Sequence, residues 1–478
     1  MRRLCRWSLA RLFTVAVAFS VGFAVVAAES DIEVLREAAV TALGDDAASL
    51  WPRLGEELRA AIGRPDALDR MSRQLRQQYG REKELLDESL HTQSGMTHYR
   101  RVARYERSEL LLATALTVDA EGVIQGLAIT LEQPAPDLPP GLPELPAGSL
   151  PPSEWIETML KELVGVSLPA VIVGVRDAAG RRVIAAGDAG DGEPPDKHTF
   201  FEAGSITKGL TGLLLAEMIA SGDVTADQTL ASLMPSDIAL SPALADITLA
   251  ELATHRSGLP RLGAGPDMQR RLATDNPYAG STAEEVFRDV ARVRESTIEQ
   301  GRGQYLYSNL GTALLGQLLA RVADQSYEFL LKERVFEPLQ LGGLALAQAD
   351  VAERERLAVG SLQGVPTTPW RMDAYAPAGG WQTNVEQLLD LGERLLRQEP
   401  AWVADALQPL YRDDSGGIGL AWMHGRVGDR EFIWHNGATG GFSGYLAIVP
   451  EEALVLVVLA NGASGVDAIA EALLAAGH

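Results

Sequence analysis

A proline-rich stretch in the first third of the chain divides the sequence into two parts. Between residues 134 and 152 the chain reads PAPDLPPGLPELPAGSLPP, in which eight of the nineteen residues are proline. Proline has no backbone N–H to donate, so such a stretch forms no regular ladder of hydrogen bonds and prefers an extended, semi-rigid form. We therefore predict a linker over 134–152 between two domains. The alternative is a proline-rich motif that binds a partner.

The first 28 residues follow the plan of a secretory signal peptide. Four arginines come first, an apolar run fills residues 12–28, and small residues end that run just before Glu29. We predict that residues 1–28 are a signal peptide and that the protein is exported to the periplasm or the extracellular space. The alternative is an uncleaved membrane anchor, since the run is near the lower length limit for spanning a bilayer.

Charge and composition exclude several classes of function. The formal net charge of −22 argues against a nucleic-acid partner, because the phosphates would be repelled. The only cysteine, Cys5, lies in the predicted signal peptide, so the mature chain would lack disulfides and thiolate sites. The seven histidines are scattered and form no His-x-x-x-His pair, so no metal site is expected. No cofactor is expected either, and the oligomeric state stays open.

Residues 29–133 are predicted to form a small α+β module. Apolar residues recur at three-to-four spacing over 31–43 and 65–91, which predicts helices. The period then changes to that of strands over 97–119 and 123–133, with a turn at 120–122. This module contains no recognisable catalytic constellation.

Residues 153–478 are predicted to form a second, larger α+β domain. The sequence predicts an opening helix, a hairpin, three late strands and a closing helix over residues 153–165, 170–187, 431–437, 444–450, 453–461 and 465–476, in that order. Strands at both ends with helices between them indicate one antiparallel sheet built from the two ends of the domain. A helical region would pack against that sheet.

Chemistry is suggested first by the sequence FEAGSITK, residues 201–208, at the start of an apolar run. Ser205 and Lys208 are three residues apart and would share one face of a helix. A lysine that is desolvated there loses its preference for the charged state, so it can accept the serine proton and make the serine a nucleophile. The alternative is a plain helix cap with a solvated lysine, but no other Ser-x-x-Lys occurs in the chain.

Two further motifs supply the partners that such a nucleophile needs. Tyr307 and Asn309 form the only Tyr-x-Asn: the phenol, held beside an ammonium, would ionise more easily and shuttle protons, and the amide would bind substrate. His435 and Gly437 form the only His-x-Gly, at a strand end. His435 would give a proton or partial positive charge to a substrate carboxylate, and the N–H groups of Ala438 and Ser205 would form an oxyanion hole.

The order Ser-x-x-Lys, Tyr-x-Asn, His-x-Gly resembles that of the serine β-lactamases and penicillin-binding peptidases. The resemblance is to the branch with class C β-lactamases, DD-peptidases, D-aminopeptidases and esterases, and it covers about 153–478. LATHRSGLP (252–260) and APAGGWQTNVEQLLDLG (376–392) reinforce it. It implies a β-lactamase-like antiparallel sheet flanked by helices, with Ser205 acylated, Lys208 its activator and Tyr307 the general acid/base.

The same resemblance implies that Asn309, His435 and Gly437 line the substrate site. One departure matters, because typical β-lactamases of this branch carry Lys-Thr-Gly where this chain has His-Asn-Gly. We therefore predict an exported serine hydrolase that acts through an acyl-enzyme on a small-molecule or peptidoglycan-derived amide, ester or β-lactam. The alternative is a catalytically silent envelope protein that serves as a binding or regulatory module.

Overall fold

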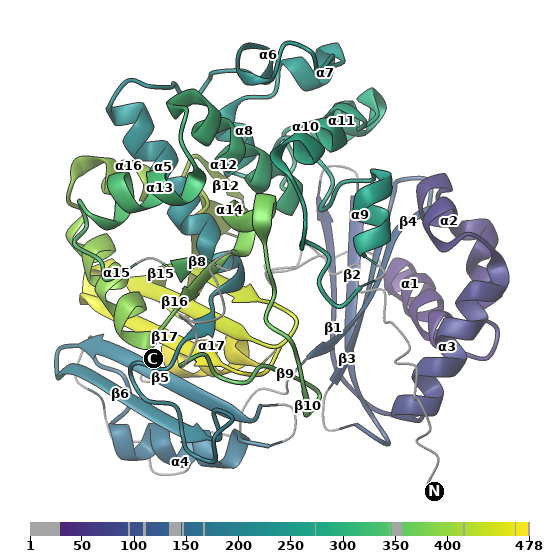
Figure 1. The fold of residues 1–478 in the computed structure, drawn as a ribbon. Helices are drawn as coiled ribbons and strands as arrows, with labels where there is room; N and C mark the ends of the chain where they lie inside the picture. The colour runs from purple at the N-terminus through teal and green to yellow at the C-terminus, as the bar shows by residue number, and fades with distance from the viewer. Residues whose placement is uncertain are drawn as a thin grey trace, which may run out of the picture. The chain divides into compact units, whose positions relative to one another are not determined.

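The computed structural model describes residues 29–93, 96–108, 111–132, 145, 148–165, 168–272, 274–343, 345–346, 356–413, 416–463 and 465–476. The chain divides into two compact units, Met1–Gln133 and Pro134–His478 (Figure 1). The predicted signal peptide, residues 1–28, lies outside the described residues, as does most of the proline-rich stretch. In the part of the chain that the structure describes, no helix has the length and apolar character needed to cross a membrane.

The first unit packs helices on one antiparallel sheet. Its helices are α1 (Glu29–Ala42), η1 (Ala47–Arg53), α2 (Glu56–Ile62) and α3 (Pro65–Tyr79). Its strands β1 (Glu82–Gln93), β2 (Met96–Tyr105), β3 (Leu111–Val118) and β4 (Ile124–Glu132) pair in the order of the chain. The prediction of a helix over 65–91 was therefore wrong beyond Tyr79. Residues 82–93 pair along β2, and this pairing overrides a local pattern that also suits a helix.

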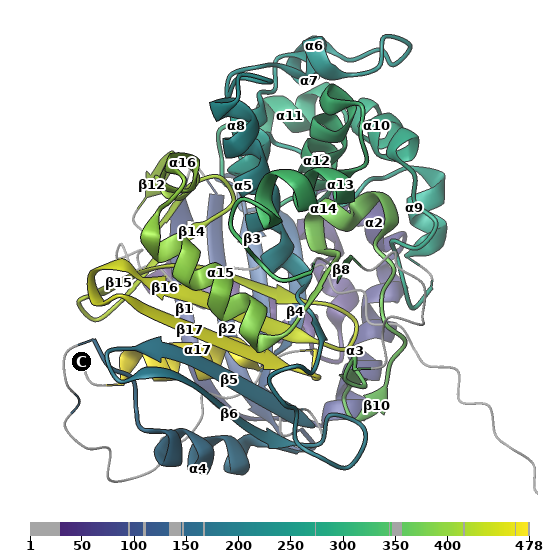
Figure 2. The ribbon, with the colours of Figure 1, turned by 60° about the vertical axis from the view of Figure 1, so that its left-hand side comes forward.

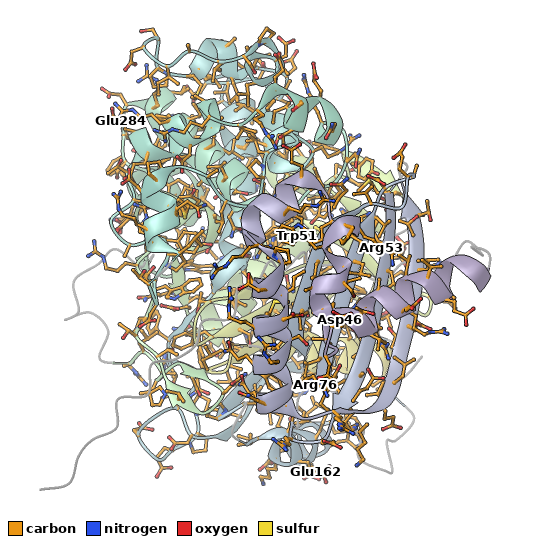
Figure 3. All side chains as sticks on the ribbon, turned by 90° about the vertical axis from the view of Figure 1, so that its right-hand side faces the viewer. Asp46, Trp51, Arg53, Arg76, Glu162 and Glu284 are labelled. Carbon is orange, nitrogen blue, oxygen red and sulfur yellow. The ribbon has the colours of Figure 1, made fainter. Side chains whose placement is uncertain are left out.

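Apolar side chains from both layers form the core of this unit. Leu35 and Ala39 of α1 and Leu68 of α3 are buried against Tyr99 of β2 and Leu116 of β3. Figure 3 labels Trp51 and Arg53 on the η1 segment and Arg76 on α3, among the side chains of the helical layer. The expected strands over 97–119 and 123–133 are present as β2, β3 and β4.

An eight-stranded antiparallel sheet is the centre of the second unit, with the order β12-β13-β14-β15-β16-β17-β5-β6. These strands are β12 (Tyr411–Asp413), β13 (Gly416–Ile418), β14 (Met423–Val427), β15 (Arg430–Ala438), β16 (Ser443–Val449), β17 (Leu454–Ala460), β5 (Ala170–Asp177) and β6 (Gly180–Gly187). β17 pairs with β5, with Leu459 opposite Ile172. The prediction of one sheet built from both ends of the domain is confirmed.

Helices cover both faces of this sheet. α4 (Ser153–Leu163) and α17 (Val466–Ala475) bury Ile156, Met159 and Ile469 against one face. α15 (Val385–Arg397) crosses the other face and joins the core that continues into the helical region (Figure 2). α5 (Thr207–Ala220) and α12 (Asn309–Ala323) belong to that second core and are buried along most of their length.

The remaining elements are short and connect the sheet with the helical region. They are β7 (Phe201–Glu202), η2 (Gly204–Ile206), α6 (Leu230–Leu233), α7 (Pro242–Ala245), α8 (Leu249–Ala253), α9 (Pro266–Arg271), α10 (Ala283–Ala291), α11 (Glu295–Gly301), α13 (Tyr327–Leu331), η3 (Lys332–Phe336), β8 (Ala345–Leu346), β9 (Ser361–Leu362), β10 (Val365–Pro366), η5 (Asp373–Tyr375), α14 (Ala376–Gly379), β11 (Trp381–Thr383), α16 (Ala401–Leu407) and η6 (Pro450–Glu452).

A buried asparagine ties the end of β17 to two neighbouring segments. Asn461 is 1% exposed. Its Oδ1 accepts from the N–H of Ala170 at 2.7 Å, and its Nδ2 donates to the carbonyl oxygens of Asp188 and Val359, both at 3.0 Å. The side chain therefore uses both its acceptor and its donors, and a carboxylate in its place would face two carbonyl oxygens.

We predict that Asn461→Asp lowers the free energy of unfolding by about 2 kcal/mol or more at neutral pH, because it removes two donors and buries a charge. Denaturant unfolding of the full chain measures this. The matched control is Asn276→Asp, because among the described residues the Asn276 side chain bonds through its Oδ1 alone, which accepts from the N–H groups of Tyr278 and Ala279. Equal stability of the two variants would contradict the assigned role of Asn461.

Candidate active site

Ser205 lies in a tight turn between the short strand β7 and the long helix α5. The 3-10 turn η2 leads directly into α5, so Lys208 stands one turn after Ser205 on the same face. Thr207 fixes this turn: its hydroxyl donates to the carbonyl of Gly204 at 2.7 Å and accepts from the N–H of Trp381 at 3.0 Å. The serine is partly exposed, so a substrate can reach it.

Lys208 is fully buried beside the serine hydroxyl. Its Nζ lies 2.9 Å from Oγ of Ser205 and donates to the carbonyl oxygen of Ala378 at 2.6 Å. Burial, followed by the positive charge of Arg261, holds the pKa of Lys208 well below its usual 10.5. An uncharged amine at this distance can accept the proton of the serine hydroxyl.

Tyr307, two residues before the start of α12, lies next to Lys208. Its ring centre lies 4.8 Å from Nζ of Lys208, and its hydroxyl is close enough to Ser205 for that serine to act on its pKa. Sequence analysis expected the neighbouring ammonium to lower the pKa of this phenol. The structure shows the opposite, because desolvation outweighs the nearby charges and raises the pKa of Tyr307 to about 12. The resting phenol is therefore protonated and suited to give a proton.

Asn309 is held at the start of α12 by a network of caps. Ser308 caps the helix, since its Oγ accepts from the N–H of Gly311 at 2.8 Å and donates to the carbonyl of Pro260 at 2.7 Å. Nδ2 of Asn309 donates to the hydroxyl of Tyr278 at 3.0 Å. Its Oδ1 is buried and has no hydrogen-bond partner among the described residues. That oxygen is suited to accept from an N–H of a substrate.

His435 is buried near the end of β15 and is neutral. Its Nδ1 donates to the carbonyl of Asn436 at 2.6 Å, which leaves a lone pair on Nε2. Burial, followed by the charge of Lys208, lowers the pKa of His435 to about 3. The histidine therefore offers an acceptor nitrogen at neutral pH, in place of the proton or partial positive charge predicted from the sequence.

Two glycines let β15 approach the serine turn closely. A Cβ on Gly437 would clash with the carbonyl oxygen of Ala203 and stand 2.7 Å from the backbone N of Ser205. A Cβ on Gly204, which has a φ of +52°, would stand 2.7 Å from the backbone N of Ala438. The two N–H groups that sequence analysis proposed as an oxyanion hole thus belong to segments in direct contact.

The sequence motifs assigned no role to three further residues of this site: His255, Arg261 and Tyr278. His255 stacks on Tyr307 with ring centres 4.5 Å apart, and its Nδ1 accepts from the N–H of Ser308 at 3.2 Å. Its pKa is well below its usual value, chiefly because of burial. The segment THRSGLPR (254–261) contains two of these residues, but its local pattern indicates only a loop. Within the described residues, no cluster of His, Cys, Asp or Glu could hold a metal ion.

The second unit is similar to proteins of a known family. The family model described as Beta-lactamase matches residues 156–477. The chain is 26% identical over 317 residues to a beta-lactamase of Escherichia coli (strain K12), covering 56% of this chain and 77% of that protein. It is 25% identical over 284 residues to the D-alanyl-D-alanine-carboxypeptidase/endopeptidase AmpH of Escherichia coli (strain K12), covering 55% and 71%.

A solved structure shows the same fold. The class C beta lactamase from Rhodobacter sphaeroides superposes with a TM-score of 0.58 at 22% identity, covering 67% of this chain and 97% of that one. The chain therefore belongs to the beta-lactamase family of serine hydrolases, which also includes penicillin-binding peptidases. The resemblance stated from the three motifs, and the fold class that it implied, are confirmed.

We predict that Gly437→Ala reduces kcat/KM by roughly 100-fold or more, because the added methyl pushes β15 off the serine turn and misaligns the two N–H groups. The measurement is steady-state hydrolysis of a chromogenic ester. Gly444→Ala is the control: Gly444 on β16 pairs with Gly437, but its Cβ would meet the side-chain ends of Leu459 and Ile206 and would touch backbone only at the ordinary contact distance of 3.8 Å. Equal activity of the two variants would contradict the prediction.

Proposed function

We propose that this protein is an exported serine hydrolase that works through an acyl-enzyme on Ser205. The observation that carries the proposal is the 2.9 Å distance between Oγ of Ser205 and the buried Nζ of Lys208. A neutral amine in that place activates a hydroxyl that is otherwise a weak nucleophile. Export rests on the signal-peptide pattern of residues 1–28.

The residues divide the chemistry between them. Oγ of Ser205 attacks the substrate carbonyl while Lys208 takes its proton, and the N–H groups of Ser205 and Ala438 stabilise the negative oxygen that forms. Tyr307, protonated at rest, gives a proton to the leaving group as the bond to it breaks. Lys208 then passes the serine proton on to Tyr307, which resets both groups. Water attacks the ester on Ser205 and gives a proton to Lys208, the acid is released, and Lys208 returns that proton to the serine oxygen.

The substrates are amides or esters such as D-amino-acid peptides, simple esters or β-lactams. Asn309 binds the substrate through its unpaired Oδ1, and Gly437 lets β15 lie close enough to the serine turn for the backbone of both segments to line the site. His435 replaces the lysine of typical β-lactamases in the third motif, and its neutral ring adds an acceptor there. This difference favours peptidase or esterase activity over fast β-lactam hydrolysis.

We predict that the acylation rate has an acid limb set by Lys208. Since the uncharged amine is the base, the rate falls as pH drops through the pKa of Lys208 and reaches its plateau well below pH 10.5. The pH dependence of kcat/KM for a neutral ester measures this. Lys208→Arg, which keeps a permanent charge, should be inactive throughout. A rate that rises only near pH 10.5 would contradict the assignment.

We predict that the mature chain forms a covalent adduct of one penicillin molecule on Ser205. Intact mass spectrometry over time, with benzylpenicillin and in parallel with p-nitrophenyl butyrate turnover, follows both acylation and release. A long-lived adduct supports a penicillin-binding peptidase, and rapid hydrolysis without an adduct supports a β-lactamase.

The control variants separate the nucleophile from other serines. Ser205→Ala should abolish adduct and turnover, while Ser232→Ala, on an exposed turn of α6, should leave both unchanged. Ester hydrolysis without an adduct would support an esterase. Neither adduct nor ester hydrolysis would overturn the proposed function and favour a silent binding protein.

A further inference from the structure

Arg261 is fixed beside the catalytic group by its backbone. Its carbonyl accepts from the N–H of Leu310 at 3.1 Å, in the first turn of α12, and the preceding carbonyl of Pro260 accepts from Ser308. Its guanidinium carbon lies 5.2 Å from the ring centre of Tyr307. Because Lys208 contacts the same ring, the guanidinium stands near the nucleophile and remains partly exposed.

The guanidinium has no anionic partner among the residues that the structure describes. Within the described residues, no carboxylate forms an ion pair with Arg261 and its side chain makes no hydrogen bond, whereas Arg271, ten positions along, pairs with Glu285. Its surroundings instead are aromatic rings and Lys208, and its charge acts on the pKa of Tyr278 as well as on that of Tyr307. The guanidinium of Arg261 therefore holds five N–H donors at the site, and none of them has an acceptor among the described residues.

The other basic groups of the site do not supply a positive charge. His435 is neutral, and burial disfavours the charged form of Lys208. The chain as a whole carries a formal charge of −22, which repels anions at long range. A substrate with a carboxylate would therefore depend on a local cation to bind, and Arg261 is placed to provide it.

We infer that Arg261 binds a carboxylate of the substrate while Ser205 attacks the neighbouring carbonyl, so that anionic acyl donors are preferred over neutral ones of the same length. The inference rests on the proposed function and adds a substrate class to it. A guanidinium matches a carboxylate with two parallel hydrogen bonds, which gives orientation as well as affinity. Arg261 is then a specificity-determining residue.

The test compares two esters with four-carbon acyl groups, p-nitrophenyl hydrogen succinate and p-nitrophenyl butyrate. Each releases p-nitrophenolate as the acyl group passes to Ser205, and water then frees succinate or butyrate. Wild type should prefer the succinyl ester. Arg261→Gln should lower the ratio of the two kcat/KM values by roughly 10- to 100-fold, because it removes charged hydrogen bonds to one substrate only. Arg261→Lys should retain part of the ratio.

The ratio of the two kcat/KM values also separates the effect of Arg261 on substrate binding from its effect on the pKa of Lys208. Loss of Arg261 raises the pKa of Lys208 and moves the acid limb to higher pH for both esters alike, so this effect cancels in the ratio. Arg270→Gln, which removes the same charge from an exposed position on α9, should leave the ratio unchanged. An unchanged ratio in Arg261→Gln, with both rates lowered together, would overturn the inference and leave Arg261 a tuning residue.

A binding measurement separates this inference from the proposed function. In the Ser205→Ala background, calorimetry with p-nitrophenyl hydrogen succinate should show about tenfold weaker binding once Arg261 is changed to Gln, and binding of the butyrate should not change. This result stands even where wild type hydrolyses neither ester and forms no penicillin adduct, an outcome that would overturn the proposed function alone. Equal binding with and without Arg261 would overturn the carboxylate inference.

Discussion

The burial of one lysine amine against one serine hydroxyl is the interaction on which the rest of the site depends. A buried ammonium without an acidic partner is strongly disfavoured, so the fold stabilises Lys208 in its uncharged form. The apolar body of α5 excludes water from this amine, and the carbonyl of Ala378 accepts one of its protons. A residue that would be destabilising in a helix core is thereby suited to the role of base that we propose for it.

The large sheet brings distant parts of the chain to this pair. β5 and β6 come from the start of the domain and β12 to β17 from its end, so the sheet closes only when both ends are present. β15 then brings His435 and Gly437 to the serine turn, while the start of α12 brings Asn309, and Tyr307 lies two residues before that helix. Each motif lies at the end of a regular element, where packing fixes its position.

Regular elements and the nucleophile pair were predictable because their signals are local. The short apolar runs in 170–187 and in the three late strands are typical of buried strands, and the spacing of Ser205 and Lys208 is set by one helical turn. The strand over 82–93 was missed because only its pairing with β2 distinguishes it from the end of α3. The local sequence of residues 82–93 does not show that they pair with β2.

The direction of the pKa shifts in the site depends on contacts between distant segments, so the sequence alone could not predict it. Tyr307 was expected to ionise more easily, but desolvation outweighs the nearby cations, and only the folded site shows which effect is larger. Tyr278 and Asn309 are 31 residues apart in sequence, and His255 and Ser308 are 53 apart. The loop that carries Arg261 shows in sequence only as a link between helices, although it forms one wall of the site.

The charge state of Lys208 is the most direct test of this account. The chain has only five lysines, so a chain labelled with nitrogen-15 at the lysine Nζ gives few resonances in an NMR titration, and Lys208→Arg assigns the one of interest. The account predicts that the Lys208 resonance changes from charged to neutral well below pH 10.5. A Lys208 that keeps its charge up to about pH 10, as a solvated lysine does, would contradict the account, because the serine would then have no base.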